Sequence, residues 1–84
     1  MADLSAPILF EEIVDFLASG PDSAAIIAFQ PSEALKQRSS YLLEGNRQDR
    51  LSVEERAELE EFTRMNHFVN MLKIRARQLL ATHR

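Results

Sequence analysis

Apolar residues recur along the chain at intervals of three and four, the spacing of amphipathic helices. The first such segment covers residues 7–19, and one stripe runs along it through Leu9, Phe10, Ile13, Phe16 and Leu17. A second, shorter segment over residues 22–29 is apolar almost all round and can be capped by Asp22 or Ser23. Pro31 disfavours helical geometry at Gln30, so this second helix must end near Phe29.

A third helix is predicted over residues 33–44, with Ser32 as its N-cap. Its inward positions are Leu35, Leu42 and Leu43. Glycine commonly closes a helix in the left-handed conformation, and we expect Gly20 to do so after the first helix and Gly45 with Asn46 after the third.

The strongest helix signal opens the last segment. Ser52 and Glu55 have the spacing of a capping box, and no glycine or proline interrupts residues 53–82. Thirty helical residues extend about 45 Å. A compact chain of this length is only about 30 Å across. The helix therefore either breaks around Asn66 and His67 or overhangs the domain and finds a partner.

This last helix has two apolar sectors at 100° per residue. The predicted core face comprises Leu59, Phe62, Met65, Val69, Leu72, Ala76, Leu79 and Leu80. His67, Met71 and Ile74 share a sector on roughly the opposite side. A helix that is apolar on two sides needs cover on both. Either the first two helices wrap around it, or these three residues form a seam with a second copy or with another protein.

Charge is divided along the chain, although the net charge is only −3. Residues 1–35 carry six acids and no base, and residues 63–84 carry five bases and no acid. Acid near helix starts and base near helix ends oppose the helix dipole, which is one sufficient explanation. The other is a basic arm around Lys73, Arg75 and Arg77 that contacts an anionic partner such as nucleic acid.

The composition argues against catalysis and against a membrane location. The chain has no cysteine, so thiolate metal sites and thiol nucleophiles are excluded. No acid or second histidine lies three or four residues from His67, so no helical metal-ligand pair exists there. The longest apolar run is residues 24–29, far too short to span a bilayer, and the acidic start is unlike a signal peptide. We expect a cytoplasmic protein that is not an enzyme and has no cofactor.

The second half of the chain carries three motifs, over residues 31–43, 51–59 and 67–77. They follow the patterns P-S-x-x-x-x-x-R-x-x-x-L-L, L-[ST]-x-E-E-x-x-E-L and H-x-x-x-x-L-K-x-x-A-R. The segment that contains them covers about 50 of the 84 residues. In this the chain resembles short bacterial all-helical proteins that look like the small partner of an HNH-type nuclease. The resemblance implies an antitoxin-like binding role, and an acidic chain suits a partner that masks a basic nuclease surface.

The sequence thus predicts one all-α domain over residues 1–84, in which three short helices pack on a long C-terminal helix over about 53–82. We expect a non-catalytic protein–protein interaction module that is antitoxin-like and binds itself, as a homodimer, or a partner such as a nuclease. The alternative is a small regulator that contacts DNA through its basic C-terminal end.

Overall fold

The computed structural model describes residues 8–82, which form four α-helices and no strand. The helices are α1 (Leu9–Ala18), α2 (Ser23–Ala28), α3 (Glu33–Arg47) and α4 (Val53–Thr82). The predicted all-α class and order of helices are confirmed. The helix predicted over 7–19 is observed from Leu9 to Ala18, with Ile8 and Ser19 as its capping residues. Residue 7 lies outside the described residues, as do residues 83–84 of the basic segment.

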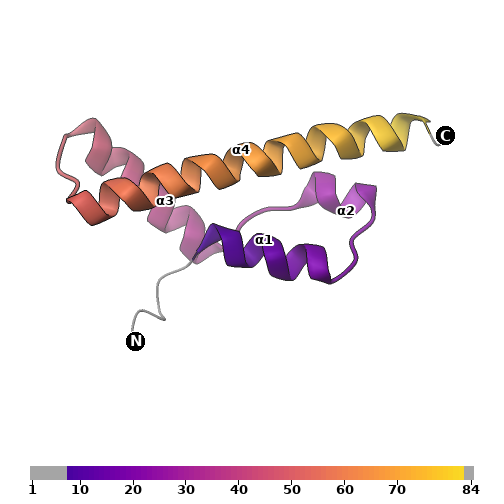
Figure 1. Cartoon of the computed structure of the whole chain (residues 1–84), viewed down its shortest axis with the longest axis horizontal. Helices are drawn as coiled ribbons and strands as arrows, with labels where there is room; N and C mark the ends of the chain where they lie inside the picture. The colour runs from indigo at the N-terminus through magenta and orange to yellow at the C-terminus, as the bar shows by residue number, and fades with distance from the viewer. Residues whose placement is uncertain (1–7, 83–84) are drawn as a thin grey trace.

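The long helix organises the molecule. Figure 1 shows α4 as a rod along the longest axis, with α1 running beside it in the same direction. α2 packs against the C-terminal half of α4, and α3 runs back along its N-terminal half. α4 continues without a break through Asn66 and His67, and its last turns extend past α2. Of the two outcomes expected for this helix, the overhang is the one observed.

Side-chain caps fix where three of the helices begin. Asp22 Oδ1 accepts a hydrogen bond from the Ala25 amide at 2.9 Å, so Asp22 caps α2. Ser32 Oγ accepts one from the Leu35 amide at 3.2 Å. Ser52 Oγ accepts from the Glu55 amide, and Glu55 Oε1 accepts from the Ser52 amide, both at 3.0 Å. The predicted capping box is therefore confirmed.

The end of α3 differs from the prediction. The helix continues to Arg47, and Gly45 lies inside it with no left-handed geometry. Asp49 adopts the left-handed conformation instead, with φ of 57°. A Cβ on Gly45 would lie 2.5 Å from Leu51 Cδ2, so glycine serves close packing here. Gly20, with φ of 75°, follows α1 as expected.

Two apolar clusters hold the helices together. Leu9, Ile13, Leu35 and Val69 join α1 and α3 to the middle of α4. Leu42, Leu51 and Leu59 join α3 to its N-terminal half. Both clusters consist of positions on the predicted inward stripes, except for Leu51, which lies between the helices predicted over 33–44 and 53–82.

Four residues predicted in the core are about half exposed to solvent: Phe10, Leu43, Leu79 and Leu80. Phe10 and Leu43 each follow a buried leucine, and the 100° step turns them away from α4. Leu79 and Leu80 lie on the turns of α4 that extend past α2, where none of the described helices covers them.

Candidate protein-interaction surface

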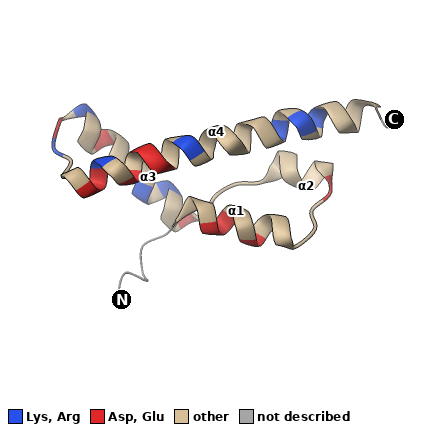
Figure 2. Ribbon diagram, in the orientation of Figure 1, with Lys and Arg blue, Asp and Glu red and all other residues tan. Residues whose placement is uncertain are grey.

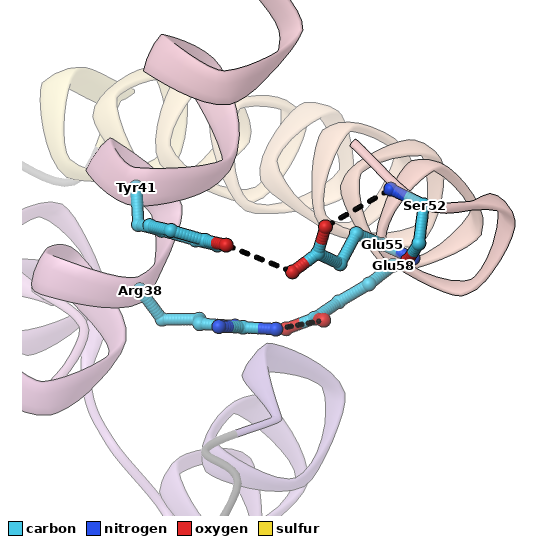
Figure 3. A network of polar contacts seen from close by, with 5 residues as sticks. All are labelled: Arg38, Tyr41, Ser52, Glu55 and Glu58. Atoms are coloured by element: carbon cyan, nitrogen blue, oxygen red, sulfur yellow. Dashed lines mark hydrogen bonds and ion pairs between the residues drawn. The ribbon is translucent and has the colours of Figure 1, made fainter. Parts of the chain in front are cut away.

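A polar network joins α3 to the N-terminal half of α4 (Figure 3). The Arg38 guanidinium donates to both carboxylate oxygens of Glu58, at 2.9 and 2.8 Å, and this contact raises the pKa of Arg38. Tyr41 Oη donates to Glu55 Oε2 at 3.0 Å. The Ser52 amide and then the Tyr41 hydroxyl lower the pKa of Glu55 from its usual 4.5. These charged groups are satisfied within the chain, so their arrangement is structural.

A mostly apolar groove of about 260 Å³ opens beside this network, between α1, α3 and α4. Its apolar lining includes Leu9, Leu35, Leu42 and Phe62. Arg38, Glu58 and Glu61 contribute its charged groups, and Phe10 lines it from α1. Helical spacing within one segment could not indicate this groove, because it forms where three separate helices meet.

The three apolar-sector residues predicted on the far side of α4 are all exposed. His67, Met71 and Ile74 follow one another at steps of four and three, so they form one strip along the helix. Met71 is 47% and Ile74 48% exposed. We call these three residues the outer strip. It points away from Val69 and Ala76, which are buried, so α1 and α2 do not wrap around to cover it.

The predicted basic residues do not form one surface. Figure 2 shows cations near the C-terminal end of α4 and acids along α1. Lys73 is half-buried, and its Nζ donates to the Phe29 carbonyl at 2.8 Å, which ties α4 to the end of α2. Arg75 and Arg77 are exposed. Two helical residues that are two apart point about 200° apart, so Arg75 and Arg77 face different ways.

A second exposed apolar surface was not foreseen. Phe10 and Val14 on α1 are 50% and 46% exposed, and Phe68 on α4 is 43% exposed. Phe68 lies between the two predicted sectors of α4 and was assigned to neither. Phe10 was assigned to the core because of its spacing from Ile13. Helical spacing alone could not show which edge of α1 stays uncovered, since that depends on where α2 and α3 lie.

Within residues 8–82, no group of three histidines or acids is placed to hold a metal ion. None of the helices in that range has the length and apolar character needed to cross a bilayer. The outer strip, the groove and the uncovered edge of α1 and α4 are thus the surfaces on which function can be argued.

Comparison with models of known protein families, with curated proteins and with solved structures gives no match. The resemblance to short nuclease-partner proteins therefore rests on the three sequence motifs alone.

Proposed function

We propose that this chain is a non-catalytic protein–protein interaction module whose docking surface is the outer strip of α4. One observation carries this proposal. Met71 and Ile74 stay about half exposed on a rigid helix that already buries its opposite face. Neighbouring exposed apolar residues mark contact surfaces, and methionine adapts its shape to different partners.

The partner class comes from charge and from the sequence resemblance. α1 presents Glu11, Glu12 and Asp15, and the first half of α4 carries further acids, so much of the surface is negative. These acids lie apart from the outer strip, so they act at longer range by attracting a basic protein toward the chain, and a nuclease is a protein with a basic active face. We propose an antitoxin-like role on this basis.

The alternative, a DNA-contacting regulator, has less support from the geometry. Lys73 is engaged with the Phe29 carbonyl, and Arg75 and Arg77 diverge around the helix. A phosphate backbone is bound by cations that converge on one side. The surface near the end of α4 offers fewer such cations than the sequence suggested.

Site-specific photo-crosslinking in the host cell tests the proposal. A benzoylphenylalanine in place of Met71 is compared with one in place of Glu60, an exposed position on the same side of α4. We expect a protein adduct from position 71 that is much weaker from position 60 and is lost on adding Ile74→Lys. An apolar contact also persists in about 0.5 M salt, in which phosphate contacts weaken by orders of magnitude. Equal cross-linking from both positions, or an adduct only with nucleic acid, would overturn the proposal.

A further inference from the structure

The uncovered edge of α1 and α4 is continuous. Phe10 on α1 and Glu61 on α4 line the same groove. The side of α1 that carries Phe10 and the side of α4 that carries Glu61 therefore meet there. Phe68 lies seven residues after Glu61, two helical turns along the same edge. Val14 lies one turn after Phe10. We call the surface formed by Phe10, Val14 and Phe68 the open face.

The opposite edge of both helices is occupied. Glu12 Oε1 accepts a hydrogen bond from the Ser32 amide at 2.9 Å, which fixes the segment after α2 to α1. Lys73 Nζ holds the Phe29 carbonyl on the same side. The chain thus covers one side of the α1–α4 pair with α2 and α3 and leaves the open face without cover among residues 8–82.

Charges of opposite sign border the open face. Glu11 and Asp15 lie one turn apart on the side of α1 away from Leu9, whereas Arg64 and Arg75 lie on the outer side of α4. No ion pair within residues 8–82 involves Glu11, Asp15 or Arg75, and Arg64 pairs only with its neighbour Glu61.

We infer that the open face binds a second copy of this chain. The two helices run in the same direction, so a two-fold axis along them lays α1 of each copy over α4 of the other. Ile13 packs beside Val69, which places the acids of α1 level with the stretch between Arg64 and Arg75. In this dimer each acidic border meets the partner copy's basic border, and the apolar residues lie between them.

The size of the face sets the expected strength. Two helices about 10 Å wide, over about 15 Å of α1 and about 22 Å of the second half of α4, present about 400 Å². Two such faces bury about 800 Å², below the size of stable interfaces, so we expect a weak dimer that forms only at high protein concentration. Met71 lies seven residues after Arg64 and four before Arg75, so the outer strip adjoins the basic border of the open face. The inference goes beyond the proposed function because it also rests on α1, and substitutions on α1, which leave the outer strip unchanged, test it separately.

Matched valine substitutions test the apolar part. Val14→Glu places a charge in the open face, and Val53→Glu places one at the 82% exposed start of α4, away from it. By sedimentation velocity, we expect the parent and Val53→Glu to dimerise, and Val14→Glu to raise the dimer dissociation constant by at least about tenfold with unchanged helicity. A parent that stays monomeric at roughly 500 μM, or equal effects of the two substitutions, would overturn the inference.

Charge reversal tests the pairing itself at exposed positions. One variant carries Glu11→Lys with Asp15→Lys, and the other carries Arg64→Glu with Arg75→Glu. In a dimer of either variant with itself, the borders of the two copies would carry like charges, so each variant alone should be monomeric. Mixed, they should form a heterodimer, because both of its borders then join opposite charges. Failure of the mixture to associate, or dimers of either variant alone, would contradict the arrangement.

Discussion

The two halves of α4 differ in how far the rest of the chain covers their side chains. In the half that α3 covers, Leu59 is buried, and both Glu55 and Glu58 have partners on α3. In the half beyond Met65, Met71 and Ile74 are about half exposed, although Val69 and Ala76 beneath them are buried. The inner face of the first half is therefore covered by α3. The second half has an inner face that is satisfied and an outer one that is available for binding.

The largest effect is expected where α3 meets the first half of α4. Leu42 is 1% exposed, so Leu42→Ala should lower the free energy of unfolding by about 2–5 kcal/mol. Leu43, its neighbour, is half exposed, and Leu43→Ala should change that free energy by less than about 0.5 kcal/mol. Urea unfolding of both variants checks this, and similar losses would mean that α3 is rotated from its observed position.

This pair of leucines also illustrates how far the sequence predicts the fold. Caps and interruptions are local, so Asp22, Ser32 and Ser52 marked helix starts correctly. Burial depends on which neighbouring helix arrives and from which side. The stripe pattern could therefore not separate Leu42 from Leu43, nor foresee that Leu51 would pack against Gly45.

The candidate surfaces show the same division. The outer strip could be predicted because it is a property of one helix, namely the angle between His67, Met71, Ile74 and the core stripe. The open face could not be predicted, since it combines Phe10 from α1 with Phe68 from α4 across 58 residues of sequence. Spacing within one segment carries no information about such a combination.

A smaller effect is expected at the start of α4. Ser52→Ala removes the acceptor for the Glu55 amide and should cost about 0.5–2 kcal/mol of unfolding free energy. Ser40→Ala is the matched control, because Ser40 is exposed in α3 and makes no side-chain hydrogen bond within the described residues. Thermal unfolding compares them. An unchanged melting temperature for Ser52→Ala would mean that this cap contributes little to holding the first half of α4.

The pH dependence of stability should also report on this half of α4. The folded chain lowers the pKa of Glu55 below 4.5, so the unfolded chain binds the proton first as the pH falls. The stabilisation is present above that value and is lost as the pH drops through the lower, folded pKa. Glu55→Gln keeps a capping oxygen but cannot titrate. The advantage of the parent over this variant in unfolding free energy should therefore shrink between about pH 6 and pH 3. A constant difference across denaturation curves in this range would contradict the assignment.

The smallest effect on stability is expected on the outer strip, where the effect on binding should be large. Met71→Glu with Ile74→Lys replaces two half-exposed side chains and sets opposite charges three residues apart, so the unfolding free energy should change by less than about 0.5 kcal/mol. Binding of a protein partner should be lost, because a charge pair must be dehydrated where apolar groups docked. Met71 shares the side of α4 that carries Arg64 and Arg75, so self-association through the open face is tested separately, with Val14→Glu on α1. Circular dichroism and partner capture of the one variant separate these outcomes. Unfolding would place Met71 and Ile74 in the core, and undiminished capture would move the docking surface off the outer side of α4.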